Sequence, residues 1–442
     1  MADRRDTIVA IATPPGIGGV GVVRLSGPLS LSITESICRD VPPARVMAKR
    51  EFRNQEGVID QGLVVCYCAP RSYTGEDLTE FHAHGNPVIL DMLVRRAVEL
   101  GARQAEPGEF TRRAFLNDRI SLLEAEAVAD LITAGSEAAV RAANRSLAGE
   151  FSARIQELRV EMESLRVEVE ASIDFGEEDI QLQNEARVLE RLEDLRTSLA
   201  NLINTASRGR VLAEGATVVI AGRPNAGKSS LMNRLTGHDA SIVTSLPGTT
   251  RDLLRERVNL GGIPVTLVDT AGLRETAEEI EAEGVRRARE VTRQADVVLY
   301  LVDAMDKDAI TAAPAEIAQL GRGAPTLLVY TKTDLGVSPD PRHLSLSAAT
   351  GAGIDVLIEA VSRHLGSFSS EESVFSARRR HLEALAKADE HLCAALLQAR
   401  QANSELFADD LRQAHEALGE ITGKTSSDEL LGRIFSSFCI GK

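Results

Sequence analysis

A phosphate-binding loop is the feature that most constrains this chain. Residues 222–229, GRPNAGKS, fit the pattern G-x-x-x-x-G-K-S. They follow a short apolar run rich in β-branched residues, 216–222, and precede SSLMNRL, which is typical of a helix start. In this strand–loop–helix order, backbone N–H groups and a helix N-terminus surround phosphate oxygens, so a chance glycine-rich turn is disfavoured. We expect Lys228 to reach the β- and γ-phosphates of a nucleotide and Ser229 to hold Mg²⁺.

Four further strings indicate that the nucleotide is a guanine nucleotide. GTTRD holds Thr249 and Thr250, a candidate switch pair whose hydroxyl joins Mg²⁺ when the γ-phosphate is present. VTLVDTAG ends a predicted strand in D-x-x-G, so we expect Asp269 to bind Mg²⁺ through water and Gly272 to sense the γ-phosphate. In TKTD, Asp334 can accept from guanine N1–H and N2–H₂, and the loop after HLSLSA backs the base. All five strings lie in order at predicted strand ends, which predicts a Ras-like GTPase domain with a mostly parallel, doubly wound sheet.

The predicted GTP-binding residues are spread over these five loops. They are Asn225, Ala226, Gly227, Lys228, Ser229, Ser230, Thr244, Ser245, Leu246, Pro247, Gly248, Thr249, Thr250, Asp269, Thr270, Ala271, Gly272, Thr331, Lys332, Thr333, Asp334, Ser347, Ala348 and Ala349. We expect Ser229 and Thr250 to bind Mg²⁺ directly.

Several positions depart from the Ras-like pattern. Leu273 follows DTAG where such enzymes place a water-orienting Gln, so another group must orient the water. The acidic run 278–281 could supply a glutamate, although most of its carboxylates are expected on a solvated helix face. Asn225 could bind a cation beside the phosphates. Thr331 stands where Asn is more usual, and its shorter side chain predicts the loss of a bracing hydrogen bond, ~1 kcal/mol.

Composition excludes several classes of protein. A chain of 442 residues predicts about three domains. The net charge of −15 argues against an electrostatic nucleic-acid coat, although a local basic face remains possible. Trp is absent and aromatic residues make up 3%, which disfavours a stacking platform for single strands. The apolar runs are too short for a membrane span, and five cysteines without framework spacing fit a reducing cytoplasm.

The chain is predicted to be multidomain. Residues 1–119 alternate short apolar runs with turn signals and predict an α+β domain, with TIVAIAT as a first strand rather than a signal peptide. Residues 120–212 and 366–442 have helical periodicity and flank a GTPase domain at 213–365. Because domain termini tend to lie close together, we infer one discontinuous helical domain into which the GTPase domain is inserted. Two separate helical domains are the alternative.

Two other groups of residues are weaker indications of a binding site. GIGGVG at 16–21 matches G-x-G-x-x-G, but a strand-like VVRLSG follows instead of a helix, so we interpret it as a tight turn rather than a dinucleotide loop. Cys66 and Cys68 share one strand face, as do His82 and His84, and across strands they could form a zinc site. Ordinary sheet positions are the more frequent explanation of such spacing.

Strings throughout the chain resemble the MnmE (TrmE) family of tRNA-modification GTPases. They include DTIVAIATPPGIGGVGVVRLSG, SYTGEDLTEFHAHGNPVIL, EPGEFTRRAFLNDRISLLEAEAVADLI and the terminal LLGRIFSSFCIGK, which generic GTPases lack. The family usually has Arg at the position of Ile17 and Asn at that of Thr331.

The resemblance implies a cytoplasmic homodimer that acts on tRNA in a heterotetramer with the flavoprotein MnmG. The product would be an aminomethyl or carboxymethylaminomethyl group on C5 of wobble uridine 34. A tetrahydrofolate derivative, 5-formyl or methylene, would supply the one-carbon unit in the N-terminal domain, which would also dimerise. The residues that match the family's folate site are Arg24, Glu80, Arg119 (usually Lys) and Lys442. Cys439 lies nearby, but a lone cysteine is more often inert, so its role stays open.

The resemblance also implies activation by K⁺ in place of an arginine finger. Asn225 would bind K⁺ with Thr244, Leu246 and Thr249, and Glu281 would be the catalytic glutamate. Pairing of GTPase domains across the dimer would complete this site. The runner-up function is a ribosome-assembly switch of the Era/Der type, but a KH-type GxxG loop is missing after the GTPase motifs. A purely structural helical adaptor is disfavoured by the complete motif set.

Overall fold

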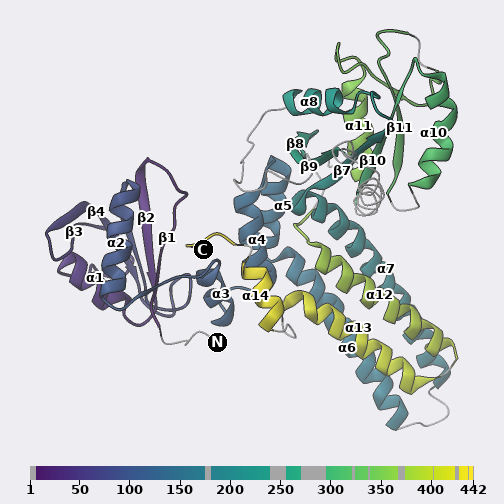
Figure 1. The fold of residues 1–442 in the computed structure, drawn as a ribbon. Helices are drawn as coiled ribbons and strands as arrows, with labels where there is room; N and C mark the ends of the chain where they lie inside the picture. Colours follow the sequence, from purple (N-terminus) through teal and green to yellow (C-terminus); the bar gives the residue numbers. More distant parts are fainter. Residues whose placement is uncertain are drawn as a thin grey trace, which may run out of the picture. The chain divides into compact units, whose positions relative to one another are not determined.

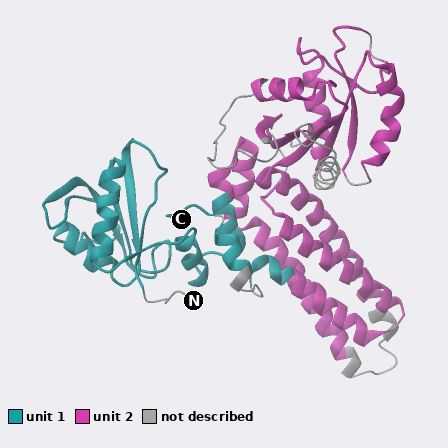
Figure 2. Ribbon diagram, in the orientation of Figure 1, with its two compact units in different colours: residues 1–129, 418–442 teal, residues 130–417 magenta. Residues whose placement is uncertain are grey.

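The computed structural model describes residues 6–174, 181–238, 255–269, 295–320, 324–336, 339–366, 374–401, 403–423, 428–436 and 438–441 (Figure 1). The chain divides into two compact units (Figure 2). Unit 1 holds residues 1–129 and 418–442, and unit 2 holds residues 130–417.

Unit 1 is built on a six-stranded sheet in the order β3-β4-β5-β2-β1-β6. Its strands are β1 (Ile8–Ile11), β2 (Gly18–Ser26), β3 (Ala48–Arg53), β4 (Val58–Tyr67), β5 (Leu78–Gly85) and β6 (Arg103–Gln104). All neighbours are antiparallel except β1 and β6. The glycine-rich segment 16–21 therefore continues directly into strand β2 and not into a helix. This agrees with the prediction that it is not a dinucleotide-binding loop.

Helices α1 (Ser30–Cys38) and α2 (Pro87–Glu99) pack on this sheet around a core that includes Phe52 and Phe81. Helix α2 begins where Asn86 accepts a hydrogen bond from Val88 N–H and Pro87 occupies the first turn. The helix lies so close to β2 that a Cβ on Gly21 would come within 2.6 Å of Leu90 Cδ1. The predicted α+β character of this region is confirmed.

The C-terminal segment belongs to the same unit. Helix α14 (Asp428–Ser436) packs on α3 (Glu109–Leu116) and the start of α4 (Leu122–Thr133). Gly108, at φ +67°, lies against it so closely that a Cβ would stand 2.6 Å from Phe435 O. The rings of Phe435 and Phe438 pack in a tilted arrangement, with 5.4 Å between their centroids. The end of the chain is thereby folded onto the N-terminal domain.

Unit 2 contains long helices from both sides of the GTPase segment. They are α5 (Glu137–Leu147), α6 (Glu150–Asp174), α7 (Gln181–Glu214), α12 (Arg379–Arg400) and, up to residue 417, α13 (Ser404–Thr422). Helix α12 packs along α7, and Figure 1 shows the two side by side. Each buries a stripe spaced by three or four residues, such as Leu192, Leu195 and Leu199 on α7. The helical domain is therefore discontinuous, as the sequence predicted.

The GTPase segment folds into a doubly wound sheet in the order β12-β11-β10-β7-β9-β8. Its strands are β7 (Ala216–Gly222), β8 (Arg255–Leu260), β9 (Ile263–Asp269), β10 (Val297–Asp303), β11 (Thr326–Thr331) and β12 (Leu344–Ser345). Only β8 runs antiparallel to its neighbour. Both faces are covered, one by α8 (Lys228–His238) and α11 (Ile354–Leu365) and the other by α10 (Lys307–Gln319). Burial on both faces explains the continuous apolar strand sequences.

A direct connection joins the helical domain to this sheet. Helix α7 ends at Glu214, and β7 begins two residues later. Arg210 on α7 forms an ion pair of 2.5 Å with Asp296, whose other carboxylate oxygen accepts the Thr217 N–H. Helix and strand are thus fastened at their junction. Among the described helices, none combines the length and apolarity that crossing a membrane requires.

Candidate functional site

The loop between β7 and α8 has the backbone that phosphate binding requires. Gly222 adopts φ +143°, and a Cβ there would stand 2.4 Å from Leu301 O on β10. Asn225 and Gly227 have φ of +61° and +89°, left-handed values that Asn and Gly tolerate best. Helix α8 then starts at Lys228, so its free N–H groups face this loop.

Lys228 places a buried ammonium inside the loop. Its side chain is 7% exposed, and Nζ donates to Gly222 O at 3.1 Å and Arg223 O at 2.8 Å. Ser229 and Ser230 follow in the first turn of α8. Asp269 ends β9 beside the loop's own strand, in register with Ile220, and is 1% exposed. The structure therefore brings Lys228, Ser229 and Asp269, which belong to two separate sequence motifs, to one edge of the sheet.

The predicted base-binding loops lie at the same edge, after β11 and β12. Thr333 N donates to Leu346 O at 3.3 Å, which joins the two loops. Asp334 is exposed, whereas Ser347 is fully buried and its Oγ accepts from Thr350 N at 3.2 Å. Ala348 and Ala349 follow Ser347 in the second loop.

Thr331 braces the phosphate loop despite its short side chain. Its hydroxyl donates to Ala226 O at 2.8 Å, and Val302 O lies 3.3 Å from the same oxygen as an alternative acceptor. Threonine thus keeps a connection between the base-binding strand and the phosphate loop, and the expected loss of bracing is not observed.

Asp303, at the end of β10, is a site residue that the sequence reasoning missed. It forms an ion pair of 2.7 Å with Lys332, which has φ +59°. Burial alone would raise the pKa of Asp303, but the Lys332 hydrogen bond and the Met305 N–H lower it below its usual value. The signal was present, because VVLYLVD is another apolar strand that ends in aspartate.

Some predicted residues lie outside the described part of the chain. These are Thr244, Ser245, Leu246, Pro247, Gly248, Thr249, Thr250, Thr270, Ala271, Gly272, Glu281 and Lys442.

A second polar site lies in unit 1, on the β2–β5 pair. Arg24 and Glu80 are opposite each other in register and form an ion pair of 2.8 Å. The Arg24 guanidinium also lies 5.6 Å from the Tyr73 ring centroid and 5.7 Å from that of Phe110. Arg24 Nη1 further donates to Gly441 O at 3.5 Å, so the C-terminal tail reaches this site within one chain.

Arg119, between α3 and α4, lies against the loop between β4 and β5 that carries Tyr73. Gly75 in this loop has φ +79°, and a Cβ on it would stand 3.2 Å from Arg119 Cγ. The Arg119 side chain is exposed there. A half-buried carboxylate, a guanidinium between two rings and a nearby exposed cation are a donor and acceptor set that suits a pterin with an anionic tail.

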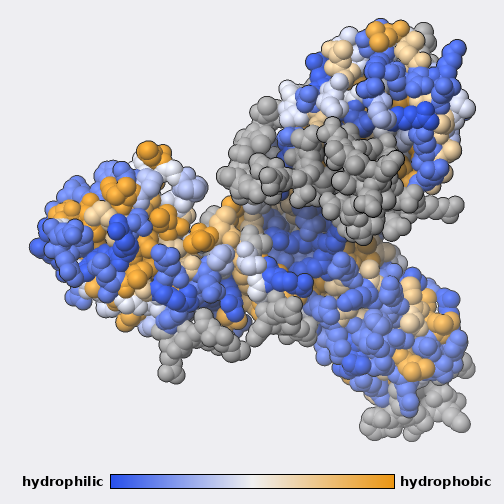
Figure 3. All heavy atoms as spheres, viewed as in Figure 1, coloured by the Kyte–Doolittle hydropathy of each residue, from blue (hydrophilic) through white to orange (hydrophobic). Residues whose placement is uncertain are grey.

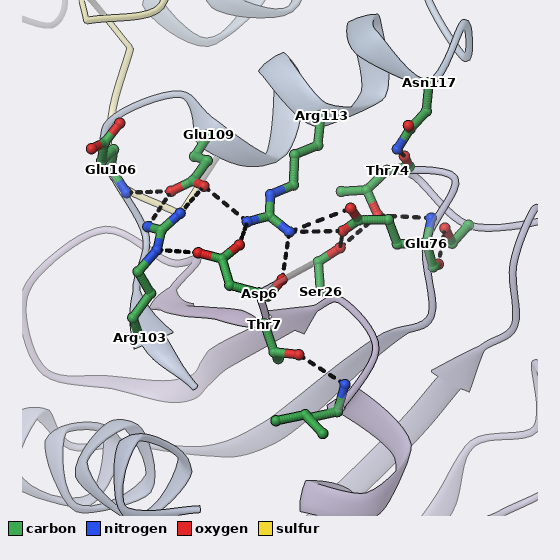
Figure 4. Close-up of polar contacts among 12 residues, drawn as sticks. Asp6, Thr7, Ser26, Thr74, Glu76, Arg103, Glu106, Glu109, Arg113 and Asn117 are labelled. Atoms are coloured by element: carbon green, nitrogen blue, oxygen red, sulfur yellow. Dashed lines mark hydrogen bonds and ion pairs between the residues drawn. The ribbon is translucent and has the colours of Figure 1, made fainter. Parts of the chain in front are cut away.

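A network of charges holds this loop in place (Figure 4). Arg113, from α3, lies between three carboxylates, at 2.5 Å from Asp6, 3.0 Å from Glu109 and 3.2 Å from Glu76. Ser26 on β2 in turn donates to Glu76 at 2.7 Å. Because Glu76 follows Gly75 directly, the network fixes the loop against β2.

Replacing Arg113 with Met should destabilise unit 1. Removing one partner from a buried pair costs ~3–5 kcal/mol, because Glu109 would keep its charge with fewer partners. Thermal or urea unfolding would measure this loss. Arg95→Met is the matched control, since Arg95 pairs with Asp91 at the surface and should cost at most ~1 kcal/mol. Equal stability of the two variants would contradict a structural role for the network.

The same comparison should depend on pH. Burial alone would raise the pKa of Glu109, but hydrogen bonds from Arg103, Glu106 N–H and Arg113 lower it below its usual value. A lowered folded-state pKa contributes stability above the unfolded pKa of about 4.3, and this stability is lost as the pH falls through the folded value. The difference between wild type and Arg113→Met should therefore shrink in acid.

The sheet register separates the cysteines and histidines considered for zinc. Cys66 lies opposite Thr79, and His82 lies opposite Leu63. His84 instead contacts Asp60 at 2.8 Å. Over the described ranges, no group of three or more His, Cys, Asp or Glu side chains is placed to hold a metal ion.

The phosphate loop, the buried Asp269 at its edge and the T-K-x-D strand end together define a P-loop GTPase of the guanine-nucleotide class. The family model for the GTP-binding protein TrmE N-terminus matches residues 7–119, and that for the MnmE helical domain matches residues 122–439. The chain belongs to the MnmE (TrmE) family.

Curated proteins called tRNA modification GTPase MnmE are similar over their whole length. The protein of Pseudomonas aeruginosa strain UCBPP-PA14 is 50% identical, with 100% of both chains covered. That of Nitrosococcus oceani is 49% identical over 99% of this chain and 97% of its own, and that of Methylococcus capsulatus is 46% identical over 100% of both. A solved G domain of the Thermotoga maritima FeoB iron transporter is 25% identical over 34% of this chain and 98% of its own, at a TM-score of 0.27.

Proposed function

We propose that this protein hydrolyses GTP in the cytoplasm as part of a tRNA-modifying complex. Together with the flavoprotein MnmG it would add an aminomethyl or carboxymethylaminomethyl group to C5 of wobble uridine 34. The observation that carries the proposal is the presence of two sites in one chain, the phosphate loop in unit 2 and the Arg24–Glu80 site beside the C-terminal tail in unit 1.

The GTP site assigns roles to residues of this chain. Lys228 lies where phosphate oxygens would replace the two loop carbonyls it now contacts, and the α8 N-terminus adds N–H donors. Mg²⁺ would be held by Ser229 and Thr250, with Asp269 behind it, and would neutralise charge on the phosphates. Asp334 would select guanine, while Ser347 to Ala349 support the base.

We further propose that K⁺ assists hydrolysis. Asn225 would bind it with Thr244, Leu246 and Thr249, and Glu281 would orient the attacking water. The position of Asn225 supports this assignment, because it lies in the phosphate loop three residues before Lys228.

A tetrahydrofolate derivative, 5-formyl or methylene, is the proposed ligand of the unit 1 site. Glu80 would accept from pterin N–H groups, and Arg24, Arg119 and Lys442 would meet the anionic parts of the molecule. The ligand would supply the one-carbon unit.

The proposed domains are a folate-binding and dimerisation domain at 1–119, helical halves at 120–212 and 366–442, and a GTPase domain at 213–365. The active assembly would be a homodimer joined to MnmG in a heterotetramer.

Complementation of a bacterial strain that lacks its own such GTPase tests the function. Nucleosides from its tRNA would be separated and identified by mass spectrometry. The wild-type protein should restore the modified wobble uridine, and Lys228→Ala should not. Unmodified uridine 34 with the wild-type protein, despite normal expression, would overturn the proposed function.

Glu281→Ala should lower kcat for GTP hydrolysis by roughly 10²-fold or more, with little change in nucleotide affinity. A residue that orients water acts mainly in the transition state, so the ground-state complex should be unaffected. Glu278→Ala, in the same acidic run, is the matched control and should keep normal turnover. Loss of GTP binding at normal turnover would instead assign Glu281 a structural role.

A further inference from the structure

One edge of unit 1 is basic although the chain as a whole carries a net charge of −15. A hollow of about 410 Å³ lies over the edge strand β3, where it meets the end of α1. Its wall contains the four cations Arg39, Lys49, Arg50 and Arg53 and the single acid Glu51. Figure 3 shows largely hydrophilic side chains at this margin of the unit.

Two of these cations are already neutralised. Arg50 binds Asp40 through two hydrogen bonds, at 2.6 and 2.7 Å, and donates a third to Lys49 O. Arg53 binds Glu51 at 2.5 Å. These pairs hold the wall in shape but use most of the donors of the two guanidinium groups.

Arg39 and Lys49 are the cations with unused donors. Both are exposed, and within the described residues neither side chain forms a hydrogen bond or ion pair. Arg39 has φ +68° just after the last residue of α1, a turn that directs the chain away from the helix axis at the rim of the hollow. With Asp40 and Glu51 subtracted from the four cations, the surface keeps two positive charges.

The floor of the hollow does not repel an anion. Burial, together with the neighbouring Cys66, raises the pKa of the Cys38 thiol to about 12, so the thiol is neutral at physiological pH. Gln61, on β4, adds an uncharged amide to the wall. The hollow therefore presents hydrogen-bond donors and positive charge around an uncharged floor.

We propose that this surface, centred on Arg39 and Lys49, binds phosphate groups of an RNA backbone. Arginine and lysine donors suit phosphate oxygens, and contacts of this kind orient a nucleic acid without reading its sequence. The inference rests on the proposed function, which makes tRNA the substrate. An anionic polymer is repelled by most of this acidic chain, so a small net-positive hollow would fix where the tRNA can approach.

The test is a titration of tRNA with the full-length protein at several KCl concentrations. Arg39→Gln/Lys49→Gln should bind several-fold more weakly and with similar loss for different tRNA sequences. The slope of log K against log[KCl] should become shallower by about two, one for each phosphate contact removed. GTP hydrolysis and the thermal midpoint should stay unchanged. Arg95→Gln/Arg363→Gln removes the same charge from two exposed helix pairs and is the matched control.

The possible outcomes distinguish failure of the proposed RNA-binding surface from failure of the proposed function. Wild-type affinity and slope in the double variant, or an equal loss in the control, would overturn the RNA surface while leaving wobble modification in the complementation assay intact. Retained tRNA binding with lost binding of polyglutamate would assign the hollow to an acidic protein and also overturn it. Failure of the wild-type protein to complement would instead count against the proposed function.

Discussion

GTP hydrolysis by this protein should be much faster in KCl than in NaCl at equal ionic strength. The DTAG motif is followed by Leu273, which cannot orient water, and Asn225 offers an amide oxygen at the phosphate loop. A cation there would neutralise charge that develops between the β- and γ-phosphates, a task for which arginine fingers contribute ~10³–10⁵ in rate. K⁺ and Na⁺ differ in size, so a fixed set of ligands around Asn225 should bind one of the two ions better, and we expect this ion to be K⁺.

Variants of Asn225 should remove the difference between the two salts. Because Asn225 has φ +61°, Asn225→Ala would add backbone strain, whereas Asn225→Gly removes the amide without it. Both variants should hydrolyse GTP slowly in either salt while still binding nucleotide. Asn233→Ala, at an exposed position of α8, is the control and should keep the K⁺ effect. Equal wild-type rates in KCl and NaCl would rule out a role for K⁺.

Removing residues 439–442 should abolish tRNA modification and weaken folate binding, yet leave GTP hydrolysis nearly intact. Residues 439–441 of the tail are packed rather than frayed, since Gly108 N donates to Cys439 O at 3.3 Å and Arg24 donates to Gly441 O. Gly441 lies against β1 so closely that a Cβ would stand 2.2 Å from Ile11 O. Loss of the tail therefore removes a wall of the proposed folate site, which is far in sequence from the phosphate loop.

Two point variants sharpen this experiment. Gly441→Ala should resemble the deletion, because Gly441 has φ +95° as well as the close contact. Ile440→Ala should behave as the wild type, because its side chain is 60% exposed. Folate binding would be followed by calorimetry, and modification by nucleoside analysis. A truncated protein that modifies tRNA at the normal rate would show that the tail is not part of the site.

The sequence predicted the local parts of this structure well. The phosphate loop and the D-x-x-G and T-K-x-D strand ends depend on short strings, and the structure places their described residues at one sheet edge. The hydrogen bond from Thr331 to Ala226 could not be predicted in this way, because it depends on the strand order of β7, β10 and β11. The residues proposed to bind folate came from the family resemblance alone, and no sequence spacing pairs Arg24 with Glu80.

The Arg113 network shows a different limit. Its carboxylates come from the segment before β1, the loop before β5 and α3, which lie far apart in the sequence. Charged residues in these segments look like ordinary surface positions until the sheet brings them together. The zinc hypothesis illustrates the same dependence, because the register between β4 and β5 decided which side chains face each other.

Because α7 is attached to β7 at one end, a small change in its direction produces a larger displacement at its other end. Helix α7 has 34 residues and is therefore ~50 Å long, and its end is tied through Arg210 and Asp296 to the strand that leads into the phosphate loop. A tilt of one degree at this base would displace the far tip by about 1 Å. Any change in the direction of α7 where it is attached to β7 would therefore be largest at the far end of the helix.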